Sequence, residues 1–166
     1  DRNLYKATIF GFSMGGYVAL AQNCKSVSQN KKIITLGTKF DWSHEFAQME
    51  IQNLNPEKIK LKVPAFAQYL KSQHGDSWEK VVLNTANMML DLGENPILGN
   101  QELKDIKSEV LVLKGDQDKM VTEEECKYVR NALLNGQFKM LKNTVHPLEK
   151  VDSELILKEI LEFDKN

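Results

Sequence analysis

Near the start of the chain, residues 11–16 form the sequence Gly-Phe-Ser-Met-Gly-Gly directly after a short apolar segment. A G-x-S-x-G pattern in this context is typical of a tight turn from a strand into a helix, where the serine hydroxyl projects out of the sheet. Gly11 and Gly15 are expected because a side chain at either position would collide with the neighbouring strand or helix. Ser13 is therefore the candidate nucleophile.

Residues 17–21, Tyr-Val-Ala-Leu-Ala, predict a buried helix that points its N-terminus at Ser13. Backbone N–H groups at a helix N-terminus favour negative charge. The N–H of Met14 is therefore the candidate donor to the oxyanion that forms when a serine attacks a carbonyl group. The alternative interpretation of the motif is a plain glycine-rich turn between a strand and a helix.

A serine hydroxyl is a poor nucleophile until a base takes its proton, and the chain has three histidines. His146 is the candidate base because it follows a predicted strand by a short loop, and Pro147 disfavours a helical backbone there. His44 and His74 lie in a region of helical patterns. For both of them, a solvated or helix-terminal histidine is the simpler interpretation.

The base needs an acid that fixes its tautomer and stabilises the imidazolium ion. Residues 110–118, Val-Leu-Val-Leu-Lys-Gly-Asp-Gln-Asp, end a buried strand with two carboxylates. Asp118 lies one step further into the loop, so it is the preferred acid. Asp116 is nearer the turn, where an Asx-type hydrogen bond to its own backbone is the ordinary role. Asp41, which follows the second predicted strand, is a less favoured candidate.

Four apolar segments predict the strands that must position these groups: residues 6–10, 32–37, 109–114 and 138–141. The first three are continuous apolar runs, which are typical of strands covered on both faces of a parallel sheet. Helical patterns separate them, so the fold class is α/β. One helix is predicted after Thr122, with a capping box to Glu125 and an end at Asn135-Gly136. The last is predicted over residues 152–163, with a buried face made of Ile156, Leu157, Ile160, Leu161 and Phe163.

The segment between the second and third strands is much longer than the 10–12 residues or so that a crossover needs. It predicts at least three helices, one after Ser43, one from Pro64 to His74-Gly75, and one capped by Asp76. We expect residues 38–108 to form a helical lid over the carboxyl ends of the strands, where ligands bind in open α/β sheets. Residues 1–37 and 109–166 would then form the core domain. The alternative is simple elaboration of the core.

Apolar residues of this segment, and two that follow Asp118, are candidates to line an apolar acyl pocket. Ordinary core packing is the alternative for each, and is expected for at least half of those in the lid. The candidates are Phe40, Trp42, Phe46, Met49, Trp78, Met88 and Met89 in the lid, and Met120 and Val121 after the acid.

The chain order Ser13, Asp118, His146, each in its own loop, resembles the α/β-hydrolase superfamily. The resemblance covers essentially the whole chain. It implies that these three residues lie in the loops after the fifth, seventh and eighth strands of that fold, and that a helical cap follows the sixth strand. It implies a serine hydrolase that cleaves a carboxylic ester or related acyl bond of a small, largely apolar substrate through an acyl-enzyme. Epoxide hydrolases and dehalogenases are disfavoured because they carry an aspartate nucleophile at this position.

The full superfamily domain has four more strands, and one of their loops supplies a second oxyanion N–H. We therefore expect the chain to be the C-terminal portion of a longer hydrolase. The loss of one oxyanion donor costs on the order of 10²–10³ in turnover, so the activity of this piece alone is expected to be low. Two other functions share the pattern: a non-catalytic ligand-binding or interaction protein that uses the same cleft, and a C–C bond hydrolase.

The resemblance implies a small-molecule acyl substrate as the partner, and the composition argues against two other kinds of partner. A net charge of −1 with interspersed charges gives no basic surface for nucleic acid, and no apolar run approaches the roughly 20 residues that cross a bilayer. Cys24 and Cys126 give no disulfide framework, which favours small buried thiols and a cytoplasmic location. No metal or organic cofactor is expected, because no helix presents histidines and carboxylates at ligand spacing.

Overall fold

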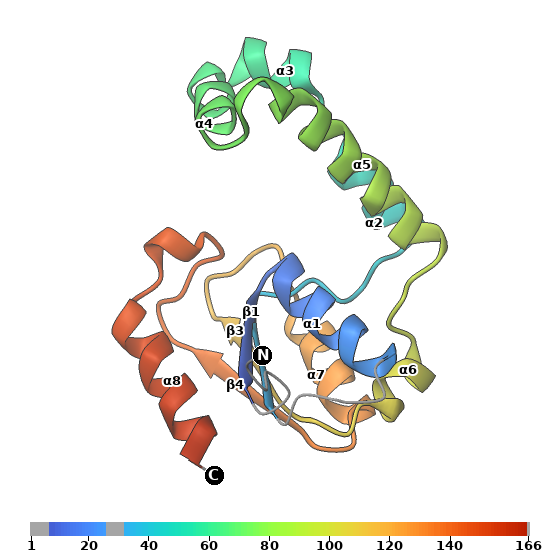
Figure 1. Cartoon of the computed structure of the whole chain (residues 1–166), viewed down its shortest axis with the longest axis vertical. Helices are drawn as coiled ribbons and strands as arrows, with labels where there is room; N and C mark the ends of the chain where they lie inside the picture. The colour runs from blue at the N-terminus through green and yellow to red at the C-terminus, as the bar shows by residue number, and fades with distance from the viewer. Residues whose placement is uncertain (1–6, 26–31, 166) are drawn as a thin grey trace, which may run out of the picture. The chain divides into compact units, whose positions relative to one another are not determined.

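The computed structural model describes residues 7–25 and 32–165. The chain divides into two compact units (Figure 1). The first unit combines the residues up to Asp41 with those from Leu98 onward, and the second consists of Trp42–Ile97. The second unit lies within the segment for which the sequence predicts a lid. Its role as a lid stays a prediction.

The first unit is built on a four-stranded parallel sheet with the order β1-β2-β3-β4. The strands are β1 (Thr8–Phe12), β2 (Lys32–Leu36), β3 (Glu109–Gly115) and β4 (Gly136–Leu141). Because all four strands run in the same direction, their carboxyl ends meet at one edge of the sheet, and the loops that follow them are neighbours. The predicted α/β fold with a parallel sheet is confirmed.

Helices α1 (Met14–Lys25) and α7 (Glu123–Ala132) cover one face of the sheet, and α8 (Ser153–Lys165) covers the other (Figure 1). A short helix, α6 (Asn100–Asp105), packs against α1 and α7. The central strands β2 and β3 are buried along almost their whole length, whereas residues of β4 alternate between exposed and half-buried. The core beneath α8 consists of Ile34, Leu36, Leu111, Leu113, Leu141 and Phe163.

Several predicted boundaries shift. β1 extends two residues past the predicted end at Phe10, while the predicted first residue, Lys6, lies outside the described residues. The predicted end of α7 at Asn135-Gly136 is wrong, because the helix ends at Ala132 and Gly136 already pairs with Val110 in the sheet. Propensity locates such ends poorly where the next strand begins within a few residues.

The prediction for the last helix is wrong at Leu157 and Leu161, which are 55% and 48% exposed. The apolar stripe of α8 is narrower than the sequence suggests, because only the side with Ile156, Ile160 and Phe163 packs on the sheet. The polar Glu159 lies buried on that helix.

The second unit is helical throughout. It contains α2 (His44–Ile51), α3 (Pro56–Lys62), α4 (Pro64–His74), the 3-10 turn η2 (Gly75–Ser77) and α5 (Trp78–Glu94). α2 lies alongside α5, and α3 and α4 pack at the other end of α5 (Figure 1). The core of that end is Ile59, Trp78 and Val82.

The helix caps of this unit agree with the sequence only in part. The Ser43 side chain accepts from the N–H of Phe46 and starts α2, as predicted. The predicted cap at Asp76 is wrong: this residue lies inside η2, and α5 begins without a side-chain cap. α3 is a helix that the sequence analysis missed, although an Asn55 cap and Pro56 in the first turn are typical starting signals.

In the ranges 7–25 and 32–165, no helix combines the length and the apolar character that crossing a membrane requires.

Candidate active site

The turn between β1 and α1 holds Ser13 in an unusual conformation. Its φ of 50° lies in the left-handed region, which a residue with a side chain adopts only when its surroundings impose it. Three hydrogen bonds impose it here. The N–H of Ser13 donates to the carbonyl of Leu36 at 2.8 Å. The carbonyl of Ser13 accepts from the N–H of Gly16 at 3.1 Å and from the hydroxyl of Thr38 at 3.0 Å.

Glycine is needed at two positions of this turn because the backbones approach closely. A Cβ atom on Gly11 would lie 2.6 Å from the Cα of Gly16, and one on Gly16 would collide with the side chains of Thr38 and Thr35. The prediction for Gly15 is wrong, since a Cβ there would meet no atom within 4 Å. The crowded pair is therefore Gly11 and Gly16.

The structure brings the three predicted catalytic residues together. Oγ of Ser13 lies 3.3 Å from Nε2 of His146, and Nδ1 of His146 lies 2.8 Å from Oδ2 of Asp118. The His146 side chain is 17% exposed, while that of Asp118 is 1% exposed. One ring nitrogen therefore faces the hydroxyl while the other donates to a buried carboxylate. This is the arrangement in which an imidazole can take a proton from an alcohol.

The carboxylate of Asp118 is held from both sides. Its Oδ1 accepts from the N–H groups of Met120 at 2.8 Å and Val121 at 3.3 Å, while Oδ2 faces His146. Burial raises the pKa of Asp118, but the hydrogen bonds from His146, Met120 and Val121 outweigh it and leave the pKa below its ordinary value. The acid therefore stays ionised opposite the imidazole.

The other two candidate acids lie elsewhere. Asp116 does not bond its own backbone as predicted, because its Oδ1 accepts from the N–H of Thr144 at 3.1 Å. The carbonyl of Thr144 in turn accepts from the N–H of Gln117 at 3.0 Å. Asp116 thus ties the acid loop to the loop that carries His146. Asp41 is exposed, and Nδ1 of His146 is directed at Asp118 instead.

Gly37 is a site position that the sequence analysis missed. It directly follows β2, has a φ of 58°, and a Cβ there would lie 3.1 Å from Oδ2 of Asp118 and 3.3 Å from Nδ1 of His146. A larger residue would therefore press on the imidazole–carboxylate pair. The signal in the sequence is a glycine directly after a buried strand, at the edge where Ser13 and Asp118 also lie. Phe12 packs against the same imidazole, with ring centroids 5.2 Å apart.

Lys114 is a second site position that the sequence analysis missed. Its side chain is buried within β3, and Nζ donates to the carbonyls of Gly115 at 2.7 Å and Asp118 at 3.1 Å. A buried ammonium needs such partners because its desolvation is otherwise costly. The lysine therefore fixes the backbone on which the acid is carried. The signal was a single charged residue at the end of an apolar strand.

The predicted oxyanion donor lies at the first position of α1. Within the described part of the chain, no backbone carbonyl accepts from the N–H of Met14. This N–H follows Ser13 directly, so it is free to bind an anion that forms beside the serine hydroxyl.

The predicted substrate-contacting residues are distributed over both units. In the first unit, Met120 is 48% exposed beside Asp118, Val121 is buried, and the buried Phe40 donates its N–H to Glu125. In the second unit, Trp42 packs edge to face on Phe46 with ring centroids 5.7 Å apart. Of the remaining candidates in that unit, Trp78 is in the core, Met49 and Met88 are exposed and Met89 is half-buried.

The two other histidines, His44 and His74, have surroundings that do not include Ser13. His44 pairs with Glu94 within the second unit, and His74 ends α4. Among residues 7–25 and 32–165, no group of three or more histidine, cysteine or acidic side chains is arranged to hold a metal ion.

Comparison with known proteins identifies the fold. No family model and no curated protein matches the sequence. Among solved structures, an α/β hydrolase enzyme from a Medee basin deep-sea metagenome library is 17% identical, with a TM-score of 0.66 over 99% of this chain and 66% of its own. A thermophilic esterase from Thermogutta terrifontis is 22% identical, with a TM-score of 0.66 over 95% of this chain and 64% of its own. A serine hydrolase involved in carbazole degradation is 16% identical, with a TM-score of 0.66 over 95% and 63%.

The chain has the α/β-hydrolase fold, covered in part, as its sequence predicts. It spans slightly less than two thirds of the length of these solved structures. All three of these solved structures are hydrolases, and the likeness to them shows the fold.

Proposed function

We propose that the chain carries the catalytic triad of a serine hydrolase that cleaves a carboxylic ester or related acyl bond. The observation that supports this most is the continuous series of contacts from Ser13 Oγ to His146 Nε2, at 3.3 Å, and from His146 Nδ1 to Asp118 Oδ2, at 2.8 Å. A serine held at positive φ beside an imidazole with a buried carboxylate behind it is a costly arrangement. A protein that only binds a ligand would gain nothing from it.

In the proposed reaction, Ser13 Oγ attacks the substrate carbonyl carbon while His146 Nε2 takes the hydroxyl proton. The resulting oxyanion accepts a hydrogen bond from the N–H of Met14. The imidazolium, stabilised by the ionised Asp118, returns its proton to the leaving alcohol as the C–O bond breaks. A water molecule, deprotonated by His146, then hydrolyses the acyl-enzyme and restores Ser13. No metal or cofactor enters these steps.

The substrate would be a small, largely apolar acyl compound. Met120, exposed directly after the acid, is a candidate contact from the first unit. Phe40, Trp42 and Phe46 are further candidates, with the helical unit acting as a lid.

A fluorophosphonate probe tests the proposal on the folded chain, because such probes phosphonylate only an activated serine. We expect stoichiometric labelling that disappears in Ser13→Ala and persists in the matched control Ser72→Ala, an exposed serine of α4. Absence of labelling in a folded sample would favour a ligand-binding protein. Comparing turnover of p-nitrophenyl esters with that of a vinylogous diketone would separate an esterase from a C–C bond hydrolase that uses the same triad.

A further inference from the structure

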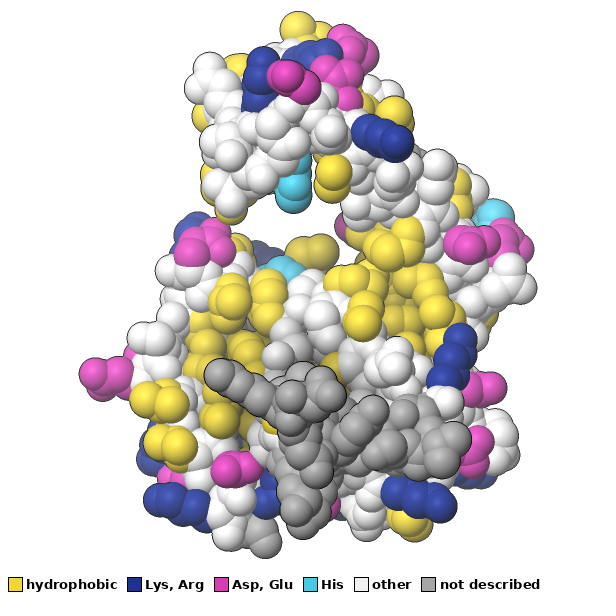
Figure 2. All heavy atoms as spheres, in the orientation of Figure 1, with side chains coloured by type: hydrophobic (Ala, Val, Ile, Leu, Met, Phe, Trp, Pro, Cys, Tyr) yellow, Lys and Arg dark blue, Asp and Glu magenta, His cyan; other side chains and the backbone are white. Residues whose placement is uncertain are grey.

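One segment of the second unit carries more lysines than carboxylates. Although the unit carries seven acidic residues and five lysines, residues 51–75 contain four of those lysines and a single carboxylate, Glu57. This segment forms α3 and α4. Figure 2 shows lysine, acidic and hydrophobic side chains together at this end of the unit, where Glu79 pairs with Lys60 and Asp76 with Lys71. An excess of one charge on a short segment raises the local concentration of anions.

Two of these lysines form no ion pair with a carboxylate of residues 7–25 or 32–165. Lys60 pairs with Glu57 at 2.9 Å and with Glu79 at 2.8 Å, but no acidic side chain of the described residues pairs with Lys58 or Lys62. These two lie four residues apart on α3, on the same face of the helix. Like charges at this spacing repel each other and destabilise a helix. An anion between the two ammonium groups would remove that repulsion.

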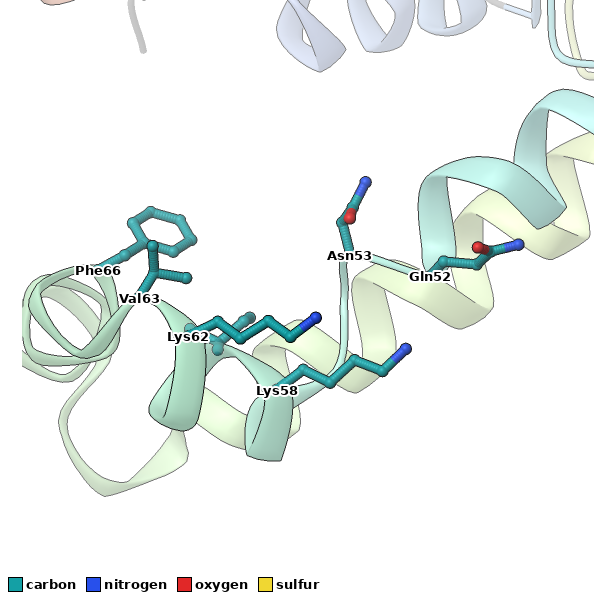
Figure 3. Close-up of a pocket in the computed structure, with 7 residues that line it drawn as sticks. Gln52, Asn53, Lys58, Lys62, Val63 and Phe66 are labelled. Atoms are coloured by element: carbon teal, nitrogen blue, oxygen red, sulfur yellow. The ribbon is translucent and has the colours of Figure 1, made fainter.

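The same face borders a cavity of about 440 Å³, a size typical of small-ligand sites. Figure 3 shows Lys58 and Lys62 extending in the same direction, toward the segment that carries Gln52 and Asn53. The remaining lining residues, Ile59, Val63 and Phe66, are apolar.

The apolar wall is accessible. Ile59 is 3% exposed and belongs to the core of the unit, while Val63 and Phe66 are 50% and 46% exposed. Phe66 stacks on Tyr69, with ring centroids 6.3 Å apart, so its ring has a supported position at the rim. The cavity therefore combines two cations and two amides at one end with an aliphatic and aromatic surface at the other.

The helix dipole explains only part of this arrangement of lysines and apolar side chains. A lysine in the last turn of a helix stabilises the carbonyl end of the helix dipole, which accounts for Lys62. It does not account for Lys58, which lies in the first half of α3, nor for Val63 and Phe66 facing the same cavity in water.

We propose that this cavity binds a single-chain carboxylate, a small fatty-acid anion. The carboxylate binds the ammonium groups of Lys58 and Lys62 and accepts hydrogen bonds from the amides of Gln52 and Asn53, while the hydrocarbon chain packs on Val63 and Phe66. Neither Ser13 nor His146 takes part, so the site stands whether or not the chain hydrolyses esters.

Decanoate is the probe, and the measurement is a ¹H–¹⁵N NMR titration of the full chain. We expect saturable shifts centred on residues 52–66. Decyltrimethylammonium, which has the same chain length with the opposite charge, and acetate, which has the charge without the chain, should each bind at least about tenfold more weakly. Equal binding of the cationic amphiphile, or shifts confined to residues around Ser13, would overturn the proposal.

Two double variants test whether the charges of Lys58 and Lys62 contribute to binding. Lys58→Gln with Lys62→Gln should weaken decanoate binding about tenfold, because each exposed charge contact contributes a few-fold. Lys71→Gln with Lys80→Gln makes the same change in net charge elsewhere on the unit and should leave affinity within about twofold. Equal losses in both would reduce the effect to net charge and contradict a defined site.

Phe66→Ser tests the apolar wall, and its exposed position makes loss of folding a minor concern that a thermal melt checks. We expect weaker binding of decanoate with little change for acetate. If the chain binds vesicles of phosphatidylglycerol but not dissolved decanoate, the surface is a membrane contact and the proposal is wrong.

Discussion

The two units hold their functional side chains in different ways. In the first unit, Ser13, His146 and Asp118 lie on loops at the carboxyl edge of a parallel sheet, and each is fixed by partly buried hydrogen bonds or close backbone contact. In the second unit, the lysines of α3 and α4 extend from helix surfaces and form exposed ion pairs or none. α4 has no buried residue at all.

The difference follows from the size and composition of the cores. The first unit buries whole strands between helices, whereas the second, Trp42–Ile97, relies on a few large side chains such as Trp78. Units of this small size bury proportionally less surface and open more easily. The proposed covalent catalysis needs atoms held within tenths of an ångström, which suits the first unit, whereas the proposed binding of a flexible anion needs less precise positions.

The largest expected effect is on the buried acid. Asp118→Asn should lower the rate of Ser13 labelling by on the order of 10³–10⁴, because an amide cannot stabilise the imidazolium and favours the wrong tautomer. Stopped-time labelling with the fluorophosphonate measures the rate.

The matched control is Asp41→Asn, at the exposed acid that follows β2, for which we expect a change below about threefold. A similar slow-down in both variants would show that Asp118 has no special connection to His146.

Two glycines with almost the same φ angle sharpen the comparison between the units. Gly37 has a φ of 58° and Gly75 one of 59°, but only at Gly37 would a Cβ meet other atoms, those of Asp118 and His146. Gly75→Ala should cost about 1–3 kcal/mol of stability from strain alone. Gly37→Ala should cost at least as much and also slow labelling of Ser13 about tenfold or more, by displacing the pair.

Thermal melts and labelling rates on both variants measure this. Unchanged labelling in Gly37→Ala would mean that the imidazole and carboxylate have more room than the structure shows.

The accuracy of the sequence-based predictions differs between the two units. The sheet and the positions of Ser13, Asp118 and His146 on its carboxyl edge could be predicted because apolar runs, a glycine-rich turn and chain order are local signals with few alternatives. The catalytic roles of these residues stay predictions. Gly37 was missed because its importance arises from two side chains that are distant in sequence.

Other errors have the same origin. Asp116 was assigned a local turn role because its partner, Thr144, is 28 residues away and cannot be identified from spacing. Leu157 and Leu161 were predicted to be buried because a helical period shows an apolar stripe but not how wide a face its neighbour covers. Asp76 has a plausible capping spacing to Glu79, but a 3-10 turn occupies its place. Tertiary packing decides such choices.

Lys114→Met tests whether the buried cation stabilises the acid loop. Methionine has a similar length but no donor, so the carbonyls of Gly115 and Asp118 lose their partner. We expect a loss of about 1–2 kcal/mol in unfolding free energy and a several-fold slower labelling of Ser13. Lys139→Met, which removes a partner of Glu159 on α8, is the control: it should lower stability without changing labelling. If both variants label at the wild-type rate, Lys114 contributes packing alone.

The smallest expected effect concerns how readily each unit opens, which the alkylation rate of a buried thiol measures. Burial raises the pKa of Cys126 to about 12, so at pH 8 only about one thiol in 10⁴ is ionised in the native state. Alkylation of Cys126 should therefore report opening of α7 from the sheet. A cysteine introduced by Val82→Cys, in the core of the second unit, reports opening there. We expect the second thiol to react faster at low urea, because its unit has the smaller core. The same rate for both at every urea concentration would show that the chain opens as one cooperative unit, and the contrast between a rigid site and a looser binding surface would not hold.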